Sequence, residues 1–405
     1  MQWLRRFRLQ QDYKNNFKTR KRKAGASLFL VFYKSNIMKK RLLFILSVII
    51  LVTACEKSTD SPETDPLAEY RSELLENVTN NIIIPAHENL QNKVEILSNK
   101  ALDFSSDPTL LNLSELRDAW VNAYMSWQSV EMFDIGKAEE ISYVSSMNTY
   151  PCNPTQINNN LLSQSYDLNQ ANFPSWTAQG FPALDYMLYG LDADSNMVLN
   201  YYQGTDATKY LTYLNDIISQ MKINTDLVLQ YWQTNKESFI SSDGNTSTSS
   251  LNLLTNDFIY YYEKGLRANK IGIPCGVWNG FQVYEIGIEA YYRQDISKKL
   301  ALESLNACKD FFMGKGINSE IFGVSYNDFL SANGDEGLSA DIINALSEAE
   351  MEINNLDNNF RIQLMQDNLP MLDAYDELQD VVVLLKVNML YSLNITVDYQ
   401  DSDGD

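Results

Sequence analysis

The sequence has 405 residues, of which 45% are hydrophobic, and a formal net charge of −20 at pH 7. A chain of this length buries a sizeable core, and its acidic balance disfavours binding to nucleic acid. The sequence contains one histidine, so a histidine-rich metal cluster is excluded and a serine–histidine–aspartate triad has a single candidate base. No motif of a zinc peptidase, a nucleophile elbow or a phosphate-binding loop is present, which disfavours the usual hydrolases and nucleotide enzymes.

The N-terminal part of the chain has the pattern of a targeting segment preceded by an extension. Met38–Arg41 is a short basic stretch, Leu42–Val52 is apolar, and small residues then lead to Cys55. The apolar run is shorter than the about 20 residues that a membrane-spanning helix needs. The pattern resembles a bacterial lipoprotein signal. We therefore expect a signal peptide at 38–54 and lipidation of Cys55, and we interpret 1–37 as a mis-assigned upstream extension.

The segment after the signal peptide is polar and acidic. Residues 55–66 include two prolines and are interpreted as a tether, so ordered structure is expected from Leu67. Residues 55–405 carry 19 basic and 51 acidic side chains, a net charge of −32. Such a surface favours cations or basic partners, but it also keeps a protein soluble on a crowded cell surface. Charge alone therefore does not identify a ligand.

The rest of the chain has helical periodicity almost throughout. Apolar side chains recur every three or four residues in six long segments. These segments are 114–133, 207–232, 250–266, 297–314, 338–356 and 369–393. Ser114 and Ser297 are the expected N-caps of the first and fourth of them. Only residues 394–399 suggest a strand.

The number of helical segments predicts more than one core. About 350 residues exceed one ordinary core, so we predict an all-α fold of two packed helical bundles, at 67–200 and 201–396, and an acidic tail at 397–405. Long irregular stretches separate the helices, at 146–160, 190–206, 237–250 and 269–280. Loops of this length in a compact protein are often functional.

The cysteines after Cys55 do not indicate a site. Cys152, Cys275 and Cys308 have neither the spacing of zinc ligands nor that of a redox pair. An odd count in an exported protein permits one disulfide and one buried thiol. No pairing follows from the sequence.

Two carboxylates stand in apolar surroundings. Glu131 follows Trp127 by four residues and continues the aromatic stripe of the predicted helix, where it needs a cation, a hydrogen-bond donor or a proton. Asp185 lies in the apolar stretch Gln179–Gly190, which Pro182 is expected to open as a helix. A carboxylate in the first turn interacts favourably with the helix dipole, so Asp185 is either a structural charge there or part of a binding site.

Other titratable residues are weaker candidates. Glu285 and Glu289 are a predicted like-charge pair one helical turn apart, which beside several tyrosines could line a site for a hard cation. On a solvated face the same pair would have no role. The one histidine, His87, is more typical of a packing or surface residue than of a ligand.

Several segments, in order, resemble the imelysin family. The stretch "AWVNAYMSWQSVEMFDIG" is similar to the first signature of that family, and "YPCNPTQINNNL" to the proline-flanked segment ahead of its motif. "GFPALDYMLYG" resembles the region of its G-x-H-x-x-E motif. "NKIGIPCGVWNG" and the following residues up to Gly316 are similar to imelysin-like lipoproteins of Bacteroidetes-type bacteria. The likeness runs through most of residues 67–400.

The resemblance implies an all-helical protein of two domains with a cleft at their interface. Gly180 keeps its place in the motif, but Pro182 stands at the histidine and Asp185 at the glutamate. A histidine-dependent metal site or peptidase centre is therefore not carried over, and no catalytic residue is assigned. Glu131 and Glu289 match acidic positions of the family. These five residues are the predicted cleft residues, with Glu131, Asp185 and Glu289 as ligands of any hard cation, such as iron or calcium.

Three functions remain open on this basis. The first is a non-catalytic lipoprotein that binds a cation, a chelate or a peptide during iron or nutrient acquisition. The second is a metallopeptidase of the imelysin type, and the third is a structural or interaction protein of the cell surface with an outer-membrane protein partner. The residue after Cys55 is Glu56 rather than the aspartate associated with inner-membrane retention, so a lipid anchor in the outer membrane is expected.

Overall fold

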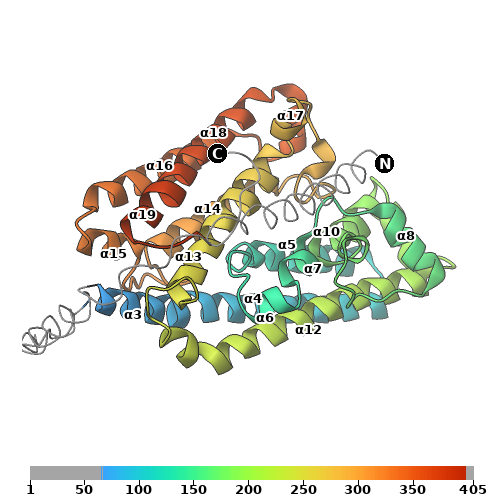
Figure 1. Ribbon diagram of the computed structural model, residues 1–405. Helices are drawn as coiled ribbons and strands as arrows, with labels where there is room; N and C mark the ends of the chain where they lie inside the picture. Colours follow the sequence, from blue (N-terminus) through green and yellow to red (C-terminus); the bar gives the residue numbers. More distant parts are fainter. Residues whose placement is uncertain (1–64, 66, 398–405) are drawn as a thin grey trace, which may run out of the picture. The chain divides into compact units, whose positions relative to one another are not determined.

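The structure is a computed structural model that describes residue 65 and residues 67–397. These residues are almost entirely helical (Figure 1), and within them strand-like pairing is limited to one isolated bridge between Lys315 and Phe322. The predicted all-α fold is confirmed. The strand predicted at 394–399 is wrong for its described part, because residues 395–397 leave the last helix through left-handed Asn394 and pair with no other strand.

The first part of the described chain contains three long helices. They are α4 (Ile84–Ser106), α5 (Leu110–Trp127) and α12 (Ala207–Ile240). Before α4 lie α3 (Ala68–Asn77) and the π-helical η1 (Val78–Ile83). The short elements between α5 and α12 are α6 (Lys137–Glu140), α7 (Tyr143–Asn148), α8 (Pro154–Ser163), α9 (Phe173–Trp176), α10 (Gly180–Asp185), the π-helical η2 (Tyr186–Gly190) and α11 (Ser195–Gln203).

The second part continues with helices of medium length. In chain order they are α13 (Ser250–Tyr260), the π-helical η3 (Tyr261–Gly272), the 3₁₀ turns η4 (Val277–Asn279) and η5 (Glu285–Gly287), α14 (Ser297–Phe312), α15 (Tyr326–Ala332), α16 (Glu336–Asn355), α17 (Phe360–Gln366), α18 (Leu369–Val383), the π-helical η6 (Leu384–Met389) and α19 (Leu390–Ser392). All six predicted helical segments therefore contain helix, with shifted ends.

Two predicted helix starts are wrong. The first-segment helix α5 begins at Leu110, because the side chain of Thr109 accepts a hydrogen bond from the backbone N–H of Asn112 and caps it. Ser114 lies inside this helix. Ser297 is the first residue of α14 rather than its N-cap, and its hydroxyl donates to the backbone oxygen of Glu289 at 3.0 Å.

Helix packing follows the apolar stripes of the sequence. α4 contacts both α5 and α12, and the three helices lie side by side (Figure 1). Leu90, Val94 and Leu97 recur along the face of α4 at helical spacing and are fully buried. Further along the chain, α18 packs against α16 and η3. The predicted division into bundles at 67–200 and 201–396 stays a prediction, although α12, from the second range, packs on α4 from the first.

Helix α13 continues without a break into η3, a π-helical segment of 12 residues. Segments of π-helix are rare, usually a single turn, and frequent at functional sites. η3 carries three polar residues of the site described below, Tyr261, Lys264 and Lys270.

No helix in residues 65 and 67–397 is long and apolar enough to cross a membrane. The predicted upstream extension at 1–37, the signal peptide at 38–54 and the lipidation site Cys55 lie outside the described residues. Cys152, Cys275 and Cys308 are all free thiols, so the disulfide that the cysteine count permits is not formed among them.

Gly180 allows helix α10 to approach α7 closely. Its φ of +70° is a backbone conformation that side chains rarely adopt, and a Cβ atom there would lie 2.2 Å from the backbone oxygen of Met147. Across α10, the indole N–H of Trp120 donates to the backbone oxygen of Phe181 at 3.2 Å, and Tyr124 stacks on the Phe181 ring with centroids 4.5 Å apart. Contacts with α7 on one side and with α5 on the other therefore fix the position of α10.

We expect Gly180→Ala to lower the free energy of unfolding by more than about 2 kcal/mol, because the substitution adds backbone strain and a clash with immobile backbone. Urea denaturation followed by circular dichroism measures this. Gly334 also has a positive φ, +86°, but open space around it. Gly334→Ala should therefore cost only the strain, about 1–2 kcal/mol. Equal losses in the two variants would show that the contact with Met147 is unimportant.

Candidate functional site

Glu131 and Glu289 meet at one buried ammonium group, that of Lys270. The Lys270 Nζ atom lies 2.7 Å from Glu289 Oε2 and 3.4 Å from Glu131 Oε2. Glu131 is 7% exposed, and Lys270 and Glu289 are each 2% exposed. The prediction that Glu131 is a carboxylate in need of a cation or a donor is confirmed. The helix α5 ends at Trp127, however, so Glu131 lies in the turn after the helix rather than on its stripe.

Two amide side chains complete the bonding of this site, which we call the Lys270 cluster: Glu131, Lys270, Glu289, Gln128 and Asn148. Asn148 Nδ2 donates to Glu131 Oε1 at 2.8 Å and to Glu289 Oε1 at 2.9 Å. Lys270 Nζ donates to Gln128 Oε1 at 2.8 Å. Because the amides bond to both carboxylates and to the ammonium group, the cluster satisfies its own polar atoms away from water.

The charges of the cluster are set by mutual attraction. Burial alone would lower the pKa of Lys270, but the neighbouring Glu131 and Glu289 carboxylates outweigh burial and raise it above its ordinary value. Lys270 is therefore an ammonium ion at neutral pH. Burial, with the nearby carboxylates, raises the pKa of Tyr261 well above its usual range, so its phenol stays protonated and donates to Glu131 Oε2 at 3.3 Å.

Asp185 bonds to a different part of the chain. Its carboxylate accepts hydrogen bonds from the backbone N–H groups of Tyr292, at 2.8 Å, and Arg293, at 2.9 Å. Helix α10 begins at Gly180 and continues without a break into η2, so Asp185 lies beyond its first turn, which contains no acidic residue. The predicted interaction of Asp185 with the N-terminus of a helix is therefore wrong: the bonds to the later turn replace it.

The turn that Asp185 holds also carries Glu289. Asp185 binds the amides three and four residues after Glu289, and Ser297 binds the backbone oxygen of Glu289. Asp185 is thus a positioning residue for the Lys270 cluster. Burial raises its pKa to about 7, although the two backbone N–H groups favour its ionised form.

The three predicted metal ligands are therefore not grouped. Glu131 and Glu289 share the Lys270 ammonium group, which supplies positive charge between them, whereas Asp185 is bonded to backbone amides. Among the residues that the structure describes, no three histidine, cysteine, aspartate or glutamate side chains are arranged to hold a metal ion.

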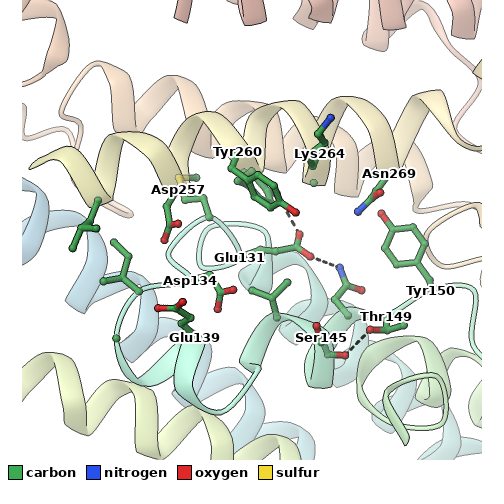
Figure 2. Close-up of a pocket in the computed structure, with 18 of the residues that line it drawn as sticks. Glu131, Asp134, Glu139, Ser145, Thr149, Tyr150, Asp257, Tyr260, Lys264 and Asn269 are labelled. Atoms are coloured by element: carbon green, nitrogen blue, oxygen red, sulfur yellow. Dashed lines mark hydrogen bonds between the residues drawn. The ribbon is translucent and has the colours of Figure 1, made fainter. Parts of the chain in front are cut away.

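A cleft of about 920 Å³ borders the Lys270 cluster. It lies between the segment 131–151 and the continuous helix of α13 and η3 (Figure 2). Its carboxylates are Glu131, Asp134, Glu139 and Asp257. Its aromatic side chains are Tyr150, Tyr231, Phe239, Tyr260 and Tyr261. Of these residues only Glu131 was predicted from the sequence, since the others show no pattern that distinguishes them from ordinary surface or core positions.

A smaller, mostly apolar cavity of about 240 Å³ lies next to the cleft. Pro182 and Asp185 line it, and Tyr150 and Pro151 line both cavities. Of the five predicted cleft residues, Glu131 faces the large cleft, Pro182 and Asp185 face the small cavity, and Gly180 and Glu289 are buried behind them, outside both linings.

His87 and Glu285 are not part of either cavity. His87 is fully buried, with its ring 6.5 Å from that of Tyr143, and burial lowers its pKa to about 3. Of the two roles predicted for it, packing or surface, His87 has the packing role. Glu285 lies in a 3₁₀ turn and pairs with Arg361 at 2.8 Å, so the predicted helical pair of Glu285 and Glu289 is wrong.

We expect Lys270→Met to lower the free energy of unfolding by about 3–5 kcal/mol at pH 7, because it leaves two buried carboxylates without a cation. Urea denaturation at pH 7 measures this loss. Lys222→Met is the matched control, since the partly exposed Lys222 pairs with surface carboxylates and its loss should cost less than about 1 kcal/mol. Similar losses in both variants would contradict this view of the cluster.

Asp185 should make stability depend on pH. Its pKa of about 7 in the folded protein lies above the ordinary 3.8, so the folded state holds this proton more tightly than the unfolded state. The stabilisation is complete below pH 3.8 and is lost as the pH rises through 7, by at most about 1.4 kcal/mol per pH unit. Relative to Asp185→Asn, which cannot titrate, the wild-type protein should therefore lose stability between pH 4 and pH 8. A constant difference over this range would be the opposite result.

Comparisons with known proteins agree with this architecture. The family model described as Imelysin, peptidase family M75, matches residues 83–383. An imelysin-like protein from Psychrobacter arcticum 273-4 superposes with a TM-score of 0.64 at 19% identity, covering 82% of this chain and 98% of that one. A protein described as an iron-regulated protein A precursor, from Parabacteroides distasonis ATCC 8503, gives a TM-score of 0.63 at 15% identity, with coverages of 80% and 95%. No curated protein matches the sequence. The chain belongs to the imelysin family.

Proposed function

We propose that this imelysin-family chain is a non-catalytic binding protein of the cell envelope, linked to iron or nutrient acquisition, that takes its ligand in the cleft beside the Lys270 cluster. The observation that carries the proposal is the cleft itself, of about 920 Å³ and lined by carboxylates and tyrosines. Ligand sites of proteins commonly enclose about 300–1,000 Å³ and combine aromatic walls with a few polar groups. The cleft has this size and this chemistry.

The contacts of the titratable groups favour binding over catalysis. Proline at position 182 offers no ligand atom, and His87 is packed in the core without lining the cleft. Two members of the Lys270 cluster, Glu131 and Asn148, line the cleft. The Glu131 carboxylate already bonds to Lys270 and Asn148. A zinc metallopeptidase commonly binds its metal through histidines, and these residues supply none to the cleft.

The envelope location and the link to iron are part of the proposal. Lipidation of Cys55 would anchor the protein to the outer membrane through the tether at 55–66. An anchored protein could there bind an outer-membrane protein as its partner. The resemblance in fold to a protein described as iron-regulated supports the link to acquisition.

A cleft-filling substitution tests the proposal. We expect thermal unfolding of the wild-type protein to shift upward with at least one member of a panel of calcium, ferric citrate, polyamines and short peptides. Ser145→Trp, which adds a large side chain to the cleft lining, should abolish the shift. Ser106→Trp, at an exposed position outside both cavities, should preserve it.

Two results would contradict the proposal. One is that no compound of the panel raises the unfolding temperature of the wild-type protein more than that of the Ser145→Trp variant. The other is metal-dependent cleavage of an unfolded substrate by the purified protein, with a stoichiometric metal found by elemental analysis, which would identify a peptidase.

A further inference from the structure

We propose that the ligand of the cleft is an organic cation, an ammonium or guanidinium group on a flexible chain, as in a polyamine or in the lysine and arginine side chains of a peptide. This inference rests on the proposed function and identifies its ligand class. It follows from how charge is distributed in the cleft.

The negative charge of the cleft is concentrated away from the Lys270 cluster. Figure 2 shows Asp134, Glu139 and Asp257 at one end, and Tyr150 and Asn269 at the other. Glu131, between them, shares the Lys270 ammonium group with Glu289. Asp134 and Glu139 therefore form the charged end of the cleft, and Lys270 lies outside its lining.

The Asp134 carboxylate has like charges near it, and one of its oxygens has no hydrogen-bond donor. Its Oδ1 atom is buried and accepts no hydrogen bond. Burial raises the pKa of Asp134 to about 6, and the Glu139 and Glu131 carboxylates raise it in the same direction. A buried acceptor without a partner is unfavourable, and neighbouring like charges add to this cost. A cation bound beside the Asp134 carboxylate would offset those like charges.

The basic side chains near this end point elsewhere. Lys264 lines the cleft, but its ammonium group lies 3.1 Å from Glu263 Oε1, and in Figure 2 it points away from Asp134 and Glu139. Lys137 pairs with Glu140 at 2.6 Å. Neither of these two lysines, within the part of the chain that the structure describes, is directed at Asp134, which leaves a ligand as the proposed source of positive charge.

The shape of this end fits an organic cation better than a bare metal ion. Its carboxylates are not grouped as metal ligands, as noted for the described residues as a whole. The Tyr231 ring covers Gly136, two residues after Asp134, so closely that a Cβ atom on Gly136 would lie 2.4 Å from it. Tyr231 also lines the cleft, and an aromatic ring near a carboxylate adds cation–π attraction for a bound ammonium or guanidinium group. The rest of the cleft then accommodates the flexible chain of the ligand.

Isothermal titration calorimetry at pH 7.5 tests the inference with four probes: spermidine, an amidated glycine pentapeptide with two arginines, its counterpart with two glutamates, and calcium. We expect spermidine or the arginine peptide to bind, and the glutamate peptide and calcium not to bind. Spermidine alone would identify a polyamine site, and tighter binding of the arginine peptide would identify a peptide site. Binding should weaken at about 0.5 M salt and below pH 6, where Asp134 takes up a proton.

The double variant Asp134→Asn, Glu139→Gln should weaken binding roughly tenfold or more, since charge-assisted hydrogen bonds are lost. It removes clustered negative charge and should fold at least as stably as the wild-type protein, which circular dichroism checks. Asp341→Asn, at an exposed position of α16, is the matched control and should bind like the wild-type protein.

The possible failures are distinguishable. If calcium or the glutamate peptide binds in a manner that Ser145→Trp abolishes, and neither organic cation binds, the cleft is a binding site and the inference about its ligand is wrong. Equal affinity of the double variant and the wild-type protein for the organic cation would also overturn it. If no probe and no member of the earlier panel binds, the proposed function fails as well.

Discussion

One ammonium group, that of Lys270, determines where three distant segments of this protein lie. It joins the turn after α5, the π-helical η3 and the turn before α14 through Glu131 and Glu289. A buried ion pair adds little net stability, because the cost of removing its charges from water offsets their attraction. The loss of Lys270, however, leaves two carboxylates in the core without a cation. The cluster therefore specifies one arrangement of these segments more than it strengthens the fold.

The cleft depends on this arrangement because Glu131 belongs to both. Its two carboxylate oxygens bond to Lys270, Tyr261 and Asn148, which keeps the side chain in place at the cleft wall. Asp134 and Glu139, by contrast, are not neutralised by the cluster. Glu131 thus connects the segments that form the cleft, whereas Asp134 and Glu139 contribute negative charge to its lining. Under the proposed function, this division lets an acidic cleft be held in place by Glu131 and still attract a cation through its other carboxylates.

Local physical patterns made the helices and the buried carboxylates predictable. Apolar residues at helical spacing predicted the six long segments, and Glu131, beside an aromatic stripe, was predicted to need a cation or a donor. Lys270 was not predicted, because it lies 139 residues from Glu131 in the sequence and no local pattern marks the pairing. Asp134 and Glu139 were missed for a related reason: they become cleft residues only because α13 and η3 pack across from them. The helix ends were shifted because caps such as Thr109 competed with the serine that seemed most suitable from sequence.

Asp185 illustrates how tertiary contacts change the meaning of a motif. From sequence alone, a carboxylate after a proline indicates the first turn of a helix, but the backbone amides of Tyr292 and Arg293, more than 100 residues later, take both of its oxygens. The family motif has a histidine and a glutamate at these two positions. This chain has Pro182, whose side chain has no ligand atom, and Asp185, whose two carboxylate oxygens accept hydrogen bonds from backbone amides. Asp185 therefore supports the turn that carries Glu289. If the cleft binds a cation as proposed, the chemistry of recognition has moved from the motif to Asp134 and Glu139, and the motif retains only its structural part.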